Sequence, residues 1–177
     1  DKIGIVGING TGKTTLLRMI AGEEEPDAGQ IIRQNQIRIA WLPQNPVFPE
    51  HGTILSYAGE DETGWRVQSN LSQLGIMDYS VPLNELSGGQ RRKVALAKVL
   101  ASDFDVLLLD EPISGIDRNG TMHFYELLDQ LKREYDLSIL MISHDLDFVY
   151  EYSDRVLLLD KNVVEEGRPE EVYKTQA

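Results

Sequence analysis

A glycine-rich stretch near the start of the chain has the spacing of a phosphate-binding loop. Residues 7–14 satisfy the pattern G-x-x-x-x-G-K-[ST] and lie between a strand-like apolar run and a helix-like run. The glycines let successive backbone N–H groups point at phosphate oxygens, and the helix N-terminus adds partial positive charge. Lys13 supplies a cation for the β- and γ-phosphates, and the Thr14 hydroxyl can ligate Mg²⁺. The residues expected to bind the nucleotide are Gly7, Ile8, Asn9, Gly10, Thr11, Gly12, Lys13, Thr14 and Thr15.

The alternative interpretation of this stretch is an ordinary glycine-rich turn between a strand and a helix. From average residue frequencies, a chance match is expected in about one in a hundred chains of this length. The flanking strand and helix patterns make chance less plausible still, so the sequence predicts a nucleotide site.

Two adjacent carboxylates, Asp110 and Glu111, follow the apolar strand-like run at residues 105–109. At the C-terminal end of a buried strand, Asp110 can hold Mg²⁺ through water, and Glu111 can orient or deprotonate an attacking water. Alone, this pattern is typical of a buried strand that ends in a solvated acidic turn. Together with the phosphate loop, it predicts hydrolysis of the nucleotide.

His144 and Gln44 are two further candidates for chemistry. His144 follows the apolar run at residues 139–142, where it can meet a γ-phosphate and the catalytic carboxylate. Gln44 lies in the loop after residues 41–43 and can ligate Mg²⁺ or position water. A lone histidine after a strand, or a lone loop glutamine, is usually incidental, so both gain weight only from their order in the chain.

Residues 86–90, Leu-Ser-Gly-Gly-Gln, open a second predicted helix. Ser87 fits an N-cap, and Gly88 and Gly89 can present N–H groups at the helix N-terminus. The ordinary interpretation is a serine N-cap before an amphipathic helix. A second phosphate-binding surface is the functional interpretation.

Continuous apolar runs, one period-two alternation at residues 37–42 and apolar residues at helical spacing predict the elements that position these residues. Strands are expected at residues 3–6, 31–32, 37–42, 105–109, 138–142, 155–159 and 162–165. Helices are expected at residues 13–21, 87–101 and 169–173, around residues 122–131 and from residue 145, with short helical pieces between residues 53 and 84. This alternation predicts an α/β fold with a mostly parallel sheet and a helical insert.

Composition narrows the function classes. The 177 residues carry a net charge of -12, which argues against broad binding of nucleic acid. Without cysteines the chain has no disulfides, thiolate metal sites or cysteine nucleophile. No apolar run approaches the roughly 18 residues of a membrane span, and residues 1–4 do not resemble a signal peptide. If the protein serves a membrane, we expect a peripheral subunit.

The order of these motifs, with Ser-Gly-Ile-Asp at residues 114–117, resembles the ATP-binding cassette (ABC) ATPase family over nearly the whole chain. The resemblance implies a P-loop ATPase fold, ATP and Mg²⁺ as cofactors, and ATP hydrolysis coupled to transport. It implies that residues 87–90 of one subunit contact the γ-phosphate held by its partner, and that Asp117 lies in a dimer-contact loop. The implied catalytic residues are Glu111, His144, Gln44 and Lys13, the nucleotide contacts of the second helix are Ser87, Gly88, Gly89 and Gln90, and the metal ligands are Thr14, Gln44 and Asp110.

The resemblance also implies an assembly. One ABC ATPase domain is expected, with residues 1–46 and 102–177 as the catalytic core and about 47–101 as a helical subdomain. The implied partners are a second copy or a paired ABC ATPase, and transmembrane transporter subunits, without direct contact to nucleic acid. The implied location is cytoplasmic, on the inner face of the cell membrane.

Two departures from the family pattern leave alternatives open. The family normally has two strands before the phosphate-loop strand, with an aromatic residue that stacks on adenine, whereas Gly7 follows only six residues here. Residues 41–44 and 86–93 lean toward ABC-F-type translation factors, and residues 124–128 and 168–173 look like metal-ion importer ATPases. The leading hypothesis is a transporter ATPase, with a metal ion as the transported substrate. The alternatives are a translation factor of the ABC-F type, and a truncated, hybrid or engineered nucleotide-binding module with weak activity.

Overall fold

The computed structural model describes residues 1–59, 62–134 and 137–176. The chain forms two compact units. The first unit contains Asp1–Trp41, Phe104–Glu111 and Leu137–Ala177, and the second contains Leu42–Asp103 and Pro112–Asp136. Each unit is described below by itself.

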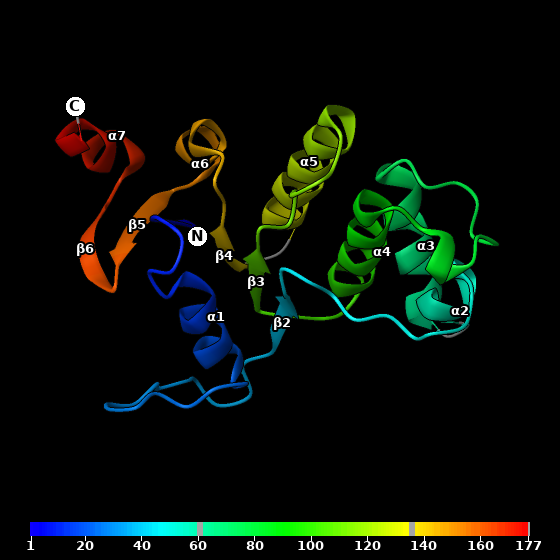
Figure 1. Ribbon diagram of the computed structural model, residues 1–177, viewed down its shortest axis with the longest axis horizontal. Coiled ribbons are helices and arrows are strands. Elements are labelled where there is room, and N and C mark those ends of the chain that lie inside the picture. The colour runs from blue at the N-terminus through cyan, green and yellow to red at the C-terminus, as the bar shows by residue number, and fades with distance from the viewer. Residues whose placement is uncertain (60–61, 135–136, 177) are drawn as a thin grey trace. The chain divides into compact units, whose positions relative to one another are not determined.

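The sheet formed by the described residues has six strands in the order β2-β3-β4-β1-β5-β6 (Figure 1). The strands are β1 (Lys2–Val6), β2 (Ile39–Leu42), β3 (Val106–Asp110), β4 (Ser138–Ile142), β5 (Arg155–Asp160) and β6 (Asn162–Gly167). The pairs β1–β4, β1–β5 and β3–β4 are parallel, and β6 is antiparallel to β5. The predicted α/β class with a mostly parallel sheet is confirmed.

Helices of the first unit cover both faces of this sheet. On one face, Leu17 of α1 (Lys13–Ala21) packs with Ile5, Leu108 and Ile142 from three parallel strands. On the other face, α6 (Leu146–Tyr152) and α7 (Pro169–Val172) contribute residues to a cluster around Val156. Figure 1 shows α1 on the side of the sheet away from α6 and α7. Parallel strands need this double cover because both of their faces are apolar.

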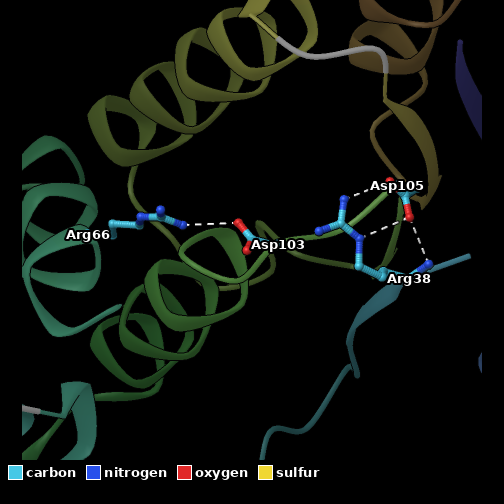
Figure 2. A network of polar contacts seen from close by, with 4 residues as sticks. All are labelled: Arg38, Arg66, Asp103 and Asp105. Atoms are coloured by element: carbon cyan, nitrogen blue, oxygen red, sulfur yellow. Dashed lines mark hydrogen bonds and ion pairs between the residues drawn. The ribbon is translucent and has the colours of Figure 1, made fainter. Parts of the chain in front are cut away.

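The edge of the sheet at β2 is held by an ion pair between Arg38 and Asp105 (Figure 2). Arg38 Nη2 donates to Asp105 Oδ1 at 2.9 Å, while the Arg38 backbone N and Nε donate to Asp105 Oδ2 at 2.8 and 3.1 Å. These hydrogen bonds lower the pKa of Asp105 to about 2. The pair fixes the start of β3 beside the start of β2.

The second unit is helical in its described parts. Its elements are α2 (Ile54–Ala58), α3 (Glu62–Gln73), η1 (Leu83–Glu85), α4 (Gly88–Leu100) and α5 (Arg118–Glu134). Val67, Leu71 and Leu74 are buried, whereas Trp65 is 63% exposed. An ion pair between Arg66 of α3 and Asp103, 3.1 Å long, connects α3 to the segment after α4 (Figure 2). No helix in residues 1–59, 62–134 and 137–176 is long and apolar enough to cross a membrane.

Two predicted strands differ in the structure. Residues 31–32 form no strand, and Ile32 is 84% exposed. The segment is instead tied to the end of α1, where Arg33 donates to the carbonyl oxygens of Met19 and Ile20 at 2.7 and 3.2 Å. The strand predicted at residues 37–42 begins only at Ile39. The preceding residue, Arg38, accepts hydrogen bonds on its carbonyl oxygen from the N–H groups of Asp105 and Val106. Short apolar runs do not reveal whether a partner strand is present.

Candidate functional site

The loop at residues 7–12 joins β1 to α1 and folds around its own lysine. Gly7 lies against β5 so closely that a Cβ atom there would approach the Leu159 carbonyl oxygen to 2.2 Å, so only glycine fits. Lys13 Nζ donates to the carbonyl oxygens of Gly7 and Ile8 at 2.7 and 2.8 Å. Thr11 Oγ1 donates to the Ile8 carbonyl oxygen at 2.9 Å. These bonds hold the loop in a curved conformation over the N-terminus of α1.

The N-terminus of α1 offers hydrogen-bond donors to an anion. The first N–H groups of any helix lack partners inside the helix. Here the N-cap is Gly12, which has no side chain to cap them, and no acidic residue occupies the first turn. The backbone N–H groups of Lys13, Thr14 and Thr15 therefore lie at the positive end of α1, where helix geometry gives them no partner inside the helix. Such an end is suited to phosphate oxygens.

The Thr14 hydroxyl and the Asp110 carboxylate lie together. Thr14 Oγ1 donates to Asp110 Oδ2 at 2.8 Å, although the residues are 96 positions apart. Asp110 is buried, with 1% of its surface exposed, at the C-terminal end of β3. The parallel order of β3, β4 and β1 brings the carboxyl ends of these strands to one edge of the sheet.

Glu111 and His144 meet at the same edge. His144 Nε2 lies 2.8 Å from Glu111 Oε1, and the Glu111 side chain is 18% exposed. Glu111 has a φ of 48°, a left-handed conformation that is uncommon for residues with a Cβ atom. Its N–H still donates to the Ile142 carbonyl oxygen at 3.0 Å, so the ladder between β3 and β4 extends one residue beyond the strand.

The turn that carries His144 is fixed on both sides. Ser143, which is buried, accepts a hydrogen bond from the Asp145 backbone N–H at 3.1 Å. Asp145 is the N-cap of α6, and its side chain accepts from the Phe148 N–H at 3.2 Å. His144 is therefore presented by a rigid turn between β4 and α6.

Lys13 is a buried cation near two carboxylates. Burial lowers the pKa of the Lys13 ammonium, and the negative charges of Glu111 and Asp110 oppose this effect by raising it. The structure thus brings together Lys13, Thr14, Asp110, Glu111 and His144, all from the first unit. These are the groups needed to hold phosphate and act on water.

The second unit carries the Leu-Ser-Gly-Gly-Gln segment at the start of α4. Ser87 and Gln90 form a reciprocal capping box. The Ser87 side chain accepts from the Gln90 N–H at 3.3 Å, and the Ser87 N–H donates to Gln90 Oε1 at 2.9 Å. Ser87 is the N-cap as predicted, and the helix starts at Gly88.

The loop that contains Asp117 packs against this helix start. A Cβ atom on Gly89 would meet the Gly115 carbonyl oxygen at 2.4 Å, so glycine is required for the contact. Lys93 Nζ of α4 binds Asp117 Oδ1 at 2.8 Å, and this hydrogen bond is the main cause that lowers the pKa of Asp117. The Gly120 N–H also donates to Asp117 Oδ2 at 3.3 Å. The two segments form one surface.

Gln44 also belongs to the second unit and is connected to the same helix. Its carbonyl oxygen accepts a hydrogen bond from Arg92 Nη2, and Arg92 is 9% exposed. The Gln44 side chain is exposed. Lys93 and Arg92 have supporting roles that the sequence did not assign. A basic run directly behind the glycine turn is the only local signal for them, because their partners lie 24 and 48 positions away.

A comparison with protein-family models matches the part of the chain that contains the phosphate loop, residues 86–90, Asp110 and Glu111. A family model described as ABC transporter matches residues 1–114. The zinc import ATP-binding protein ZnuC of Buchnera aphidicola subsp. Baizongia pistaciae is 38% identical over 178 residues, which cover 96% of this chain and 74% of that protein. The chain belongs to the ABC transporter family.

Solved structures of ABC proteins agree with the fold. An ATP-binding subunit of an ABC transporter superposes with a TM-score of 0.87 at 23% identity, covering 99% of this chain and 82% of that one, which shows the shared fold. The archaeal ribosome recycling factor aABCE1, in complex with ribosomal stalk protein aP1, has a TM-score of 0.76 at 34% identity. That match covers 89% of this chain but 31% of the recycling factor, so the chain spans about a third of its length.

As an ABC transporter family member, this protein is an ATP-binding subunit and an ATPase. The similarity to ZnuC extends over both halves of the chain, including the parts that resembled different ABC classes. The translation-factor alternative is therefore not favoured.

The residues of this ABC ATPase fit a magnesium ion bound together with the nucleotide. Mg²⁺ is usually held by one or two carboxylates plus substrate phosphates rather than by an all-protein cage. The Thr14 hydroxyl and Asp110 carboxylate, 2.8 Å apart, are oxygen donors of this kind. Among the described residues, no group of three or more His, Cys, Asp or Glu residues could hold a metal ion. The donor set therefore fits an ion whose remaining ligands come from ATP and water.

Proposed function

We propose that this protein is the ATP-hydrolysing subunit of a metal-ion importer, and that two copies pair head-to-tail around two ATP molecules. The observation that carries the proposal is the group formed by Lys13, Thr14, Asp110, Glu111 and His144 at one edge of the sheet. The similarity to a zinc import ATP-binding protein over 96% of the chain supports zinc as the ion.

The phosphate loop would bind the triphosphate of ATP. Backbone N–H groups at the start of α1 and the Lys13 ammonium would contact the phosphate oxygens. Thr14 and Asp110 would hold Mg²⁺, which when bound neutralises charge on the phosphates. The metal-ligand role of Gln44 belongs to this proposal as well.

Glu111 and His144 would carry the hydrolytic step. The Glu111 carboxylate would orient the attacking water and accept its proton while the water oxygen bonds to the γ-phosphorus. The bond between that phosphorus and the bridging oxygen of ADP breaks, which releases ADP and inorganic phosphate. His144, held 2.8 Å from Glu111, would keep the carboxylate in place and respond to the γ-phosphate.

The surface formed by residues 87–90 and the Asp117 loop would complete the ATP site of the second copy. The Ser87 side chain and the N–H groups of Gly88, Gly89 and Gln90 lie at a positive helix end. Gln44 would pass the state of the site to membrane-spanning permease subunits, with the protein bound at the inner face of the membrane. The link from Gln44 to α4 through Arg92 supports this role.

The test has an enzymatic and a cellular part. The wild-type protein should hydrolyse ATP with Mg²⁺, and Lys13→Ala should reduce this activity at least about a hundredfold by removing the phosphate cation. In a bacterium that lacks its own zinc-import ATPase, the wild-type gene should restore growth at low zinc, and Lys13→Ala should not. ATPase activity without restored growth would contradict zinc import while leaving the ATPase assignment intact.

A further inference from the structure

Two aromatic rings of the second unit pack against each other in the segment that follows β2. Phe48 lies in the loop of residues 43–52, between β2 and α2, and Tyr57 lies in α2. The centroids of their rings are 4.9 Å apart, with an angle of 36° between the ring planes. Phe48 is only 9% exposed, whereas most residues of its loop are exposed. A buried ring in an exposed loop fixes that loop to the element on which the ring packs.

Two cations of α4 lie over these rings. The guanidinium carbon of Arg91 is 5.0 Å from the centroid of Phe48, and the Lys98 ammonium is 4.0 Å from the centroid of Tyr57. Lys98 Nζ also donates to the Tyr57 carbonyl oxygen at 2.7 Å. Seven residues, about two helical turns, separate the two cations, so both lie on one face of α4. Since a cation within about 6 Å of a ring centroid is attracted to the ring, this face holds the loop and α2.

The next residue of α4 holds the same loop at Gln44. Arg92 Nη2 donates to the Gln44 carbonyl oxygen, while the Gln44 side chain is exposed. The loop is therefore attached at Gln44 and again at Phe48, four residues later, to two consecutive arginines. Both arginines directly follow residues 87–90 of the Leu-Ser-Gly-Gly-Gln surface. A displacement of that surface would carry the backbone of Gln44 with it.

We propose that Phe48 is a positioning residue for ATP hydrolysis. Its ring, held by Arg91, fixes the loop to α4, so that the Gln44 side chain and residues 87–90 keep one relative geometry. The inference rests on the role proposed for Gln44, through which Phe48 would act. Misplacement of a catalytic group by about 1 Å can cost about a hundredfold in rate, so even a partly loosened loop should slow turnover.

Steady-state ATP hydrolysis of substituted proteins tests this role. Phe48→Leu removes the ring but keeps an apolar side chain, and Arg91→Met removes the cation but keeps the apolar stem. Each should lower kcat about three- to tenfold and change KM for ATP less than about twofold, because the phosphate loop is unaltered. Arg91→Lys keeps a cation near the ring and should recover most of this loss. The matched control Trp65→Leu removes the ring of another cation–ring pair, Trp65–Arg66 of α3, and should keep the wild-type kcat.

A double-mutant cycle with Gln44 separates positioning from a general loss of structure. Gln44→Ala alone should lower kcat. In that background the side chain that Phe48 positions is gone, so Phe48→Leu should lower kcat by less than about twofold more. Equal fold losses in both backgrounds would overturn the proposal, as would a wild-type kcat in Gln44→Ala. If circular dichroism shows that Phe48→Leu does not fold, Arg91→Met carries the same cycle.

The same measurements distinguish this inference from the proposed function. A wild-type protein without Mg²⁺-dependent ATP hydrolysis would overturn both. ATP hydrolysis by the wild type, with a kcat unchanged in folded Phe48→Leu and Arg91→Met, would overturn the positioning role of Phe48 and leave the ATPase assignment intact.

Discussion

Glu111 combines an unusual backbone conformation with the position needed for chemistry. Its φ of 48° costs about 1–2 kcal/mol relative to the ordinary regions, because the Cβ atom crowds the following carbonyl oxygen. The conformation persists because the Glu111 N–H is paired with Ile142 and the side chain with His144. Strain that the surroundings maintain in this way is common at functional sites.

At Glu111, substitution by glutamine separates proton transfer from binding. Glu111→Gln keeps the size and one oxygen acceptor but cannot accept a proton from water. ATP turnover should fall at least about a hundredfold, while calorimetric ATP affinity stays within a few-fold of wild type. Unchanged turnover would show that Glu111 does not act on the water.

At the element scale, the start of α4 predicts opposite effects for two adjacent glycines. In Gly89→Ala the new Cβ atom would meet the Gly115 carbonyl oxygen at 2.4 Å, so we expect a loss of about 1–3 kcal/mol in the free energy of unfolding. Gly88→Ala meets nothing within 4 Å and should leave stability unchanged or raise it by up to about 1 kcal/mol. Urea denaturation of both variants measures the difference. Equal midpoints would contradict the packing of Gly89 against the Asp117 loop.

The pair Arg38–Asp105 predicts a pH dependence at the edge of the sheet. Because Arg38 lowers the pKa of Asp105 to about 2 in the folded protein, the pair contributes stability above the ordinary aspartate pKa of 3.8. This contribution is lost as pH falls from about 3.8 through about 2, where the folded carboxylate becomes protonated. Arg38→Met should therefore be less stable than wild type at pH 7, and the difference should shrink as pH falls through this range. A difference that does not change with pH would exclude the ion pair as its cause.

The sequence predicted those elements that have both an apolar pattern and an end signal. The helix at residues 13–21 was predicted with the bounds of α1, because Gly22 ends it, and Ser87 was correctly predicted to cap α4. The strand predicted at residues 31–32 was wrong, because two isoleucines indicate β-propensity but do not show whether a neighbouring strand exists. The order of the motifs along the chain indicated that Thr14 and Asp110 serve one site. The direct hydrogen bond between them depends on the strand order of the whole sheet, which local sequence does not determine.

The site residues divide in the same way. Lys13, Asp110 and Glu111 occur in local motifs that have a direct chemical meaning. Lys93 and Arg92 act through contacts with distant segments. Such features arise from tertiary packing and leave little trace in local spacing.

At the scale of the whole molecule, the central claim is that one chain holds only part of each catalytic site. The residues proposed to bind the phosphates are in the first unit, and the Leu-Ser-Gly-Gly-Gln surface is in the second. In the proposed dimer, each copy completes the ATP site of the other through this surface. ATP is then the bridge between copies, and hydrolysis releases them.

The mass of the Glu111→Gln protein in solution tests this claim most directly, since slow hydrolysis keeps ATP in place. By light scattering, we predict about 20.0 kDa without nucleotide and twice that mass with saturating Mg²⁺ and ATP. The control Glu111→Gln/Ser87→Arg should bind ATP yet stay at the single mass, because the added side chain blocks the surface that meets the partner's γ-phosphate. A Glu111→Gln protein that binds ATP and keeps the mass of one chain would contradict the two-chain site.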